Sequence, residues 1–253
     1  MKFAPSGQRP CHRRLRAPAR KSLAGLVALS LGSWSPPSAA ATPTTLAGLS
    51  PRQVLGVSVS AMRVARSVTR ISHEFVLARS VTATTLSTGA AALQHVDVLG
   101  HRGEIVLVRG VAYVKLDPTL VVDEFHSLVP GVANKWVSFT RRSKYFAGLT
   151  TGLTFSSLLN EVPPTGALAM SRPTTLRGVP VVAVTGTAVT TNLKASATLF
   201  IATSPPFLPV QETVTAQSSG VPVSAVTEFK NWSSVPVIVA PRIFTPSGKL
   251  RLP

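Results

Sequence analysis

Two of the chain's histidines have acidic neighbours at a spacing that could support chemistry. Asp123 and His126 are three residues apart, so on a helix they lie on one face, where they could act as two metal ligands or as a base and its orienting group. His95 and Asp97 are alternate residues of an expected strand and share one of its faces. A solvated polar face contains the same pairs, so neither pair predicts a site by itself.

The rest of the chain does not complete either pair. A zinc site needs three or four ligands, and no H-E-x-x-H motif is present. A G-x-S-x-G nucleophile elbow, a P-loop and a paired-acid motif are also missing. We therefore expect no catalytic residue, no bound metal and no cofactor, so the protein is predicted not to be an enzyme. A hydrolase that uses His126 or His95 is the alternative.

The first 41 residues predict an export signal. They hold seven basic residues and no acidic one, then a short apolar run from Leu23 to Leu31, then small residues that end at Ala41. This order is that of a cleavable signal peptide, and the apolar run is too short to span a bilayer. We predict cleavage after Ala41. An uncleaved anchor and a mitochondrial transit peptide are the alternatives.

The cysteine content limits the chemistry of the exported part. The single cysteine, Cys11, lies inside the predicted signal, so no disulfide, thiolate metal site or cysteine nucleophile is expected after cleavage. About 210 residues can bury a hydrophobic core in one domain. The predicted organisation is a signal peptide at residues 1–41, a linker at 42–49, one domain at 50–241 and a C-terminal tail at 242–253.

The exported part is predicted to be basic. Seven of the 26 basic residues lie in the first 41 residues, so the remainder keeps 19 basic against 9 acidic residues, a net charge of +10. Such a charge favours anionic partners, such as phospholipid head groups or acidic glycolipids, and an anionic membrane surface is one of them. The basic residues are scattered and few aromatic residues lie among them, so nucleic acid is not an expected partner.

Local signals predict three helices and many strands. Ser50-Pro51 and Asp117-Pro118 each predict a helix start, because a small polar side chain caps the helix and proline fits its first turn. A third helix is predicted over Thr154 to Glu161. The clearest strands are Glu104–Val108 and Val111–Lys115, an antiparallel hairpin turning at Arg109-Gly110. Both faces of the first of these strands are apolar, so the sheet must be covered on both faces or enclose something on one.

Strands are also predicted after the third helix. They cover Pro173–Leu176, Val179–Thr187, Leu193–Ala202, Val210–Ala216, Val223–Phe229 and Val235–Val239. Because strands come in runs and do not alternate with helices, the fold class is predicted to be α+β with an antiparallel sheet.

Several short motifs, in order along most of the chain, resemble one known family. They are Gly110–Lys115, Lys135-Trp136-Val137, Phe155–Leu159, Arg177–Val181, Phe207–Val210, Phe229–Trp232, Pro236-Val237 and Ala240-Pro241. In these the chain resembles the LppX/LprG type of mycobacterial lipoprotein, which is related in fold to the LolA/LolB carriers and to the periplasmic sensor RseB.

The resemblance implies a fold and a function. The fold would be a strongly curved antiparallel half-barrel with helices packed on its concave face. The function would be non-enzymatic: a carrier or chaperone of the cell envelope that holds lipid or lipoglycan acyl chains in an apolar cavity. An RseB-like sensing or protein-interaction module with no transport role is the alternative. We expect a monomer.

The chain departs from this family at the end of the apolar run. Members carry a cysteine there that is modified with lipid, in a pattern like L-x-[AG]-C, whereas this chain has Leu31-Gly32-Ser33-Trp34. Trp34 cannot be modified in this way. We therefore expect a secreted or periplasm-like protein without a lipid anchor.

Aliphatic side chains of the expected strands, with one tyrosine and the third helix, are the predicted lining of such a cavity. They are Ile105, Leu107, Tyr113, Phe155, Leu158, Leu159, Val182, Val184, Leu199 and Ile201. Valine, leucine and isoleucine would give a smooth apolar surface that suits acyl chains. Ordinary core residues without a cavity are the alternative interpretation.

Overall fold

The computed structural model describes residues 45–250, except residues 77–78, 127–128, 130, 189–194 and 219–220. All described residues belong to a single compact unit. The predicted signal peptide and its cleavage point lie outside the described residues.

The described helices are α1 (Pro51–Ala65), α2 (Pro118–Phe125), α3 (Phe146–Thr150), α4 (Phe155–Glu161) and a short 3₁₀ helix, η1 (Ser247–Lys249). The three predicted helices, α1, α2 and α4, are confirmed. At α1 the Ser50 side chain accepts a hydrogen bond from the Gln53 N–H, and the Gln53 side chain accepts one from the Ser50 N–H, which forms a capping box. Within the described chain, no helix has the length and apolar character that a membrane span requires.

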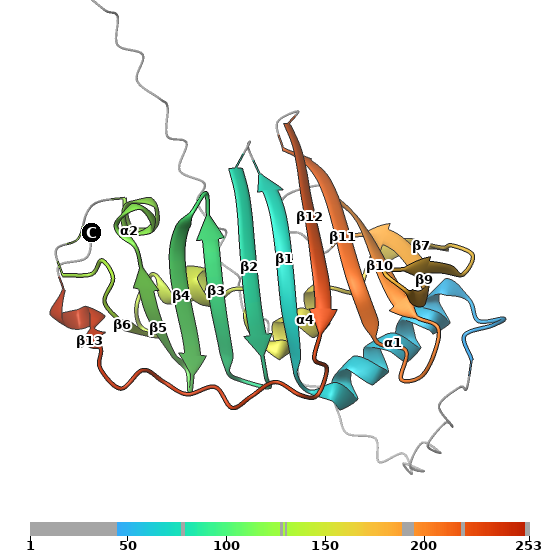
Figure 1. The fold of residues 1–253 in the computed structure, drawn as a ribbon, viewed down its shortest axis with the longest axis horizontal. Coiled ribbons are helices and arrows are strands. Elements are labelled where there is room, and N and C mark those ends of the chain that lie inside the picture. Colours follow the sequence, from blue (N-terminus) through green and yellow to red (C-terminus); the bar gives the residue numbers. More distant parts are fainter. Residues whose placement is uncertain are drawn as a thin grey trace, which may run out of the picture. The chain divides into compact units, whose positions relative to one another are not determined.

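Thirteen strands of the described chain form one sheet. Their bounds are β1 (Val68–Val76), β2 (Arg79–Ser87), β3 (Ala92–Val98), β4 (His101–Val108), β5 (Val111–Leu116), β6 (Val137–Thr140), β7 (Thr165–Met170), β8 (Thr174–Leu176), β9 (Val179–Thr187), β10 (Ala195–Ala202), β11 (Pro209–Ser218), β12 (Val221–Lys230) and β13 (Thr245–Pro246). The spatial order is β13-β6-β5-β4-β3-β2-β1-β12-β11-β10-β9-β7, and β8 also pairs with β9 (Figure 1). All pairs are antiparallel except β13 with β6.

The predicted hairpin is confirmed as β4 and β5. Ile105 pairs with Val114, and Leu107 pairs with Ala112. The two turn residues, Arg109 and Gly110, both have positive φ angles, of 52° and 74°. Two such residues in sequence form the tight turn whose twist matches that of an antiparallel pair.

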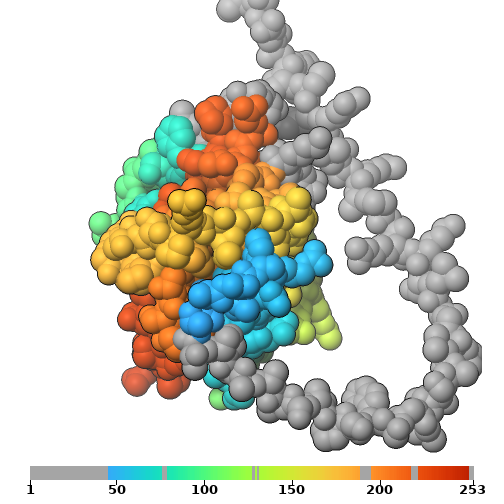
Figure 2. Space-filling model, turned by 90° about the vertical axis from the view of Figure 1, so that its right-hand side faces the viewer, coloured from blue at the N-terminus to red at the C-terminus, as the bar shows by residue number. Residues whose placement is uncertain are grey.

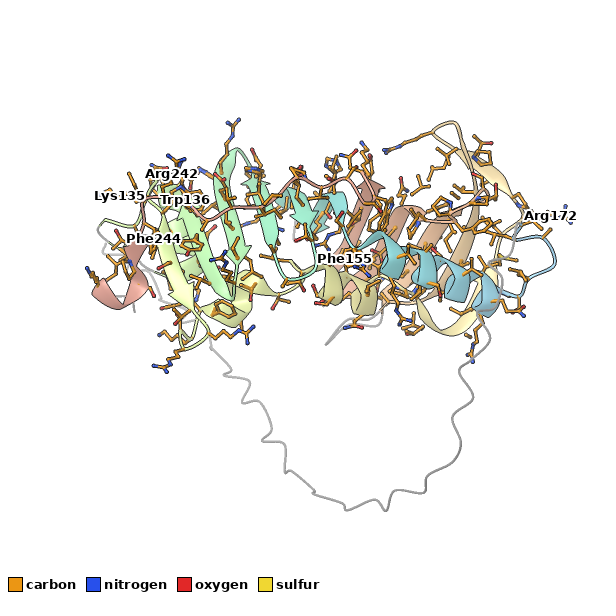
Figure 3. The ribbon with its side chains drawn as sticks, turned by 90° about the horizontal axis from the view of Figure 1, so that it is seen from below. Lys135, Trp136, Phe155, Arg172, Arg242 and Phe244 are labelled. Carbon is orange, nitrogen blue, oxygen red and sulfur yellow. The ribbon has the colours of Figure 1, made fainter. Side chains whose placement is uncertain are left out.

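The predicted fold class is confirmed: the fold is α+β, with a curved, open and mostly antiparallel sheet. Figure 3 shows α1 and α4 on one side of the sheet and the chain that follows β12 on the other. We call the side that carries α1 and α4 the helix face, and the opposite side the open face. At one end of the sheet, α1 lies against β7, and Figure 2 shows this end with α1 in blue.

Two hydrophobic clusters lie between the sheet and the helices. The first joins side chains of β4, β5 and β6 to those of α2 and α3, with Phe125 stacked on Phe139 at 6.0 Å between ring centroids. The second joins side chains of β9 and β10 to those of α1 and α4. The helix face is therefore packed at both ends of the sheet by separate groups of helices.

One predicted strand is wrong. Residues Val235–Val239 form no strand, and Thr245-Pro246 pair with β6 instead, inside the segment that we expected to be a tail. The physical reason is that Pro236, inside this run, cannot donate to a ladder of hydrogen bonds. β6, β7 and α3 were not predicted, because elements of four to six residues are too short to show a clear periodicity.

The start of α2 depends on one side chain. Asp117 Oδ1 accepts a hydrogen bond from the Leu120 N–H at 2.9 Å, and Oδ2 accepts one from the Arg102 N–H at 3.0 Å. Burial works to raise the pKa of Asp117, but these hydrogen bonds and one to His101 outweigh it and hold the pKa below its usual value. The charged form of Asp117 therefore stabilises the junction of β4 and α2.

We expect Asp117→Ala to lower the free energy of unfolding by about 1–2 kcal/mol at neutral pH, because two backbone N–H groups lose their acceptor. Guanidinium unfolding followed by circular dichroism measures this loss. Asp123→Ala is the matched control: its ion pair with Arg79, at 3.7 Å, is exposed and should be worth less than about 0.5 kcal/mol. Equal losses in the two variants would contradict the capping role.

Candidate functional site

The structure brings nine of the ten predicted lining residues to the helix face. Ile105 and Leu107 lie in the first hydrophobic cluster. The second cluster holds Phe155, Leu158, Val182, Val184, Leu199 and Ile201, and Leu159 packs against it. The eight fully packed residues expose between 0% and 8% of their surface. The predicted lining is thus a packed layer in this structure, and its role in binding stays a prediction.

Tyr113 is the exception. Its neighbours Ala112 and Val114 are buried in the first cluster, so the alternation of β5 turns Tyr113 to the open face. There its ring packs edge-on against Phe244, with 5.0 Å between ring centroids. Tyr113 therefore does not share a surface with the other nine residues.

Four hollows formed by the described residues are lined mainly by polar side chains, and none of the ten predicted residues lines them. The largest, of about 530 Å³ over β2 to β5, includes His95 and Asp97. Asp97 accepts a hydrogen bond from the Gly100 N–H and lies 3.8 Å from Arg102, so it does not orient His95.

The second predicted pair is also separate. Asp123 faces Arg79, and His126 is the C-terminal cap of α2 with a φ of 57°. Across the described residues, no group of three or more His, Cys, Asp or Glu side chains is arranged to hold a metal ion.

Sequence analysis missed a group of charged residues on the helix face, which we call the polar centre: Arg70, Glu161 and Glu212. Arg70 Nη2 donates to the carbonyl oxygen of Gly152 at 2.5 Å and to Ser87 Oγ at 3.5 Å. Ser87 Oγ donates to the carbonyl oxygen of Leu153 at 2.7 Å. These bonds tie β1 and β2 to the turn before α4.

The register of the sheet places this centre between the two clusters. Arg70 pairs with Phe229 on β12 and with Thr85 on β2, and Thr85 in turn pairs with Gln94 on β3. Glu212 of β11 pairs with Leu199 of β10, which belongs to the second cluster. The helix face is therefore apolar at both ends and polar along its middle strands.

The polar centre does not use all of its hydrogen-bonding capacity. Arg70 Nε is sealed from solvent and has no hydrogen-bond partner among the described residues. Glu212 is buried, and its carboxylate takes part in no hydrogen bond or ion pair with the described chain. Ser58 Oγ, on the buried side of α1, also lacks a partner among these residues. Buried polar groups are normally paired, so the two sealed atoms, Arg70 Nε and Ser58 Oγ, call for a specific explanation.

Burial dominates the electrostatics of the centre. It raises the pKa of Glu212 to about 7, with nearby Glu161 adding to the rise and Arg70 opposing it. Burial also raises the pKa of Glu161, again against Arg70. Glu212 is therefore poised to gain or lose a proton near neutral pH in the polar middle of the helix face.

LprF and MucB are among the solved structures that are similar to this chain, although no protein-family model and no curated protein matches it. LprF from Mycobacterium bovis is 15% identical, with a TM-score of 0.47, and the match covers 76% of this chain and 96% of LprF. MucB is 14% identical, with a TM-score of 0.40, and the match covers 76% of this chain and 63% of MucB. LprF is an LppX/LprG-type lipoprotein and MucB is RseB-like, the two types that the sequence resembles. Similarities of this size concern the fold and carry no argument about a ligand.

Proposed function

We propose that the protein is a non-enzymatic, exported carrier that binds the acyl chains of a lipid or lipoglycan between the helix face and helices α1 and α4. The observation that carries this proposal is the composition of the helix face, where apolar clusters flank a polar centre with unused hydrogen-bonding capacity. An amphiphile has the same two parts. Export is proposed from the first 41 residues.

The attachment of α1 supports this proposal. Among the described residues, no hydrogen bond or ion pair joins α1 to another element, and its buried side contacts the second cluster through Val54, Leu55 and Met62. A helix held by apolar contacts alone can exchange them for contacts with an acyl chain at little cost. We propose that α1 moves away from the sheet to admit the ligand.

Energetics favour a face of this kind. Burying a chain of about sixteen carbons is worth on the order of 12 kcal/mol against water, but close to nothing against a membrane. A carrier must therefore take up and release its ligand without a large net gain. Aliphatic side chains such as Leu199 and Ile201 offer an acyl chain much the same surroundings as a bilayer does.

A photoreactive fatty acid tests the location of binding. The full chain is incubated with a diazirine-bearing palmitic acid and irradiated, and the cross-linked peptides are identified by mass spectrometry. We expect cross-links in α1, α4, β9 and β10 that unlabelled palmitic acid competes away. Cross-links spread over the open face, or none, would contradict the proposal.

A variant tests the role of the predicted lining. Leu107→Asp and Leu158→Asp are unsuitable, because both side chains are buried and a charge there would unfold the protein. Leu159 is only partly buried, so we expect Leu159→Asp to keep the fold and to weaken fatty-acid binding about tenfold, or about 1.4 kcal/mol. Leu99→Asp is the matched control, since Leu99 is 62% exposed in the turn after β3.

Native mass spectrometry of the exported protein decides between the proposed function and its alternative. We expect a bound acyl lipid in wild-type protein and less in Leu159→Asp. Protein without lipid, together with a stable complex with another protein in cross-linked cells, would reject the carrier and favour a sensing module.

A further inference from the structure

Residues 235–244, which we call the C-terminal segment, expose an unusual number of large apolar side chains. The exposed fractions are 89% for Val237, 71% for Val239, 87% for Ile243 and 42% for Phe244. Single exposed apolar residues are common on soluble proteins, but four within eight residues are an unusual concentration of apolar surface, which favours an interaction site.

Hydrogen bonds hold this segment at both ends and not along its length, and within it the ring of Phe244 packs against Tyr113. Trp232 Nε1 donates to the carbonyl oxygen of Pro209 before the segment, and the Thr245 N–H donates to the carbonyl oxygen of Trp136 after it. Within the described chain, no hydrogen bond involves residues 235–244 themselves. Figure 1 shows the segment following the lower ends of the strands from β12 to β13.

The stretches of sequence that carry the segment and Lys135 are basic, while Glu104 on β4 pairs in register with Lys115. Residues 125–160 and 229–250 contain no acidic residue. Apart from Lys230, which pairs with Glu228, their basic residues form no ion pair within the described chain: Lys135, Arg141, Arg142, Lys144, Arg242 and Lys249.

Basic and apolar side chains meet at the end of the segment. Lys115, Lys135 and Arg242 are exposed there beside Ile243 and Phe244. Both lysines and the two apolar side chains line a hollow of about 260 Å³ with Trp136. Figure 3 shows Lys135, Trp136, Arg242 and Phe244 gathered at one end of the sheet, with Arg172 at the opposite end.

We propose that the C-terminal segment docks on a membrane surface that contains anionic lipids. Val237, Val239 and Ile243 would enter the boundary between head groups and acyl chains, and the lysines and arginines would contact lipid phosphates. Charge complementarity favours this partner over a second copy of the chain, because two copies would bring patches of the same sign together.

Vesicle flotation with the full chain tests this proposal. We expect binding to vesicles of phosphatidylcholine with phosphatidylglycerol, weaker binding to phosphatidylcholine alone, and weaker binding as salt is raised. The double variant Val237→Asp/Ile243→Asp should bind about tenfold more weakly, because two exposed apolar side chains are lost. Arg242→Gln/Lys135→Gln should reduce the dependence on phosphatidylglycerol.

Two matched controls separate the segment from the rest of the chain. Val64 on α1 is 81% exposed, so Val64→Asp adds a charge at another apolar surface position, and Arg172→Gln removes a charge at the opposite end of the sheet. Both should bind vesicles like the wild type. Equal losses in the controls and the segment variants would overturn the proposal.

Every variant still carries the predicted signal, which could itself bind the vesicles. A fluorescent label shows whether the C-terminal segment is the part of the chain that enters the membrane. With Cys11→Ser, a nitrobenzoxadiazole label on Ile243→Cys should brighten on anionic vesicles, while the label on Val64→Cys should not. An unchanged signal at position 243 would overturn the proposal. So would a dimer in solution that Val237→Asp/Ile243→Asp dissociates, since the segment would then be covered by a second copy.

Discussion

Replacing Glu212 with glutamine is expected to stabilise the protein by up to about 3 kcal/mol above pH 7. Burial raises the pKa of Glu212 from 4.5 to about 7, so the charged form of this carboxyl destabilises the folded protein. Glutamine fills nearly the same space and never carries that charge. Thermal and urea unfolding across a pH series measure the difference.

The pH range of the effect follows from the pKa of Glu212 in the two states. Between about pH 4.5 and 7 the folded protein keeps a proton on Glu212 that the unfolded chain has released. Glu212 therefore lowers stability as the pH rises through this window, and its contribution is constant above it. The difference between Glu212→Gln and wild type should be near zero at pH 4 and largest above pH 7.

Glu228→Gln is the matched control on the neighbouring strand. Hydrogen bonds from Arg177 and Lys230 outweigh burial and hold the pKa of Glu228 below its usual value. Its charged form stabilises the fold, so Glu228→Gln should destabilise the protein at neutral pH and lose this effect in acid. A Glu212→Gln variant that is as stable as wild type at every pH would contradict the buried, poised carboxyl.

The elements that could be predicted from the sequence are those with local causes. Ser50 and Asp117 begin helices because each caps its own first turn, and Arg109-Gly110 turns a hairpin because both residues take positive φ angles. The strand predicted at Val235–Val239 was wrong because its cause is not local. Whether Val235–Val239 or Thr245-Pro246 joins the sheet depends on β6, which lies about a hundred residues earlier.

The candidate site was predicted in its apolar part only. Valines and leucines at alternate positions of β9 and β10 had to share a face, and they do. Tyr113 was placed with the wrong residues. Both faces of the β4–β5 hairpin are apolar, so the sequence pattern does not show which face the helices cover.

The polar centre had no local signal at all. Alternation places Arg70 on the same face as Val68, but it does not show which strands become neighbours of β1. The sheet places β12, some 150 residues later, beside β1, and β11 beside β12, and only this arrangement puts Glu212 close to Arg70. A charge network that spans distant strands needs the topology to be known first.

Arg70→Met should have the largest effect of any single change in the centre, a loss of about 2–4 kcal/mol in unfolding free energy at pH 8, because hydrogen bonds from a charged donor are lost. The substitution removes the hydrogen bonds to Gly152 and Ser87 and leaves the buried Glu212, with Glu161 near it, without a nearby cation. Arg63→Met, at an exposed position on α1, should change stability by less than about 0.5 kcal/mol.

A double-mutant cycle shows whether Arg70 acts through Glu212. Without the arginine, the pKa of Glu212 should rise further, so the loss in Arg70→Met should grow with pH. Arg70→Met/Glu212→Gln should then recover part of that loss, because the buried charge is gone. Additive effects at every pH would mean that Arg70 only ties β1 to the turn before α4, and that the centre is not one electrostatic unit.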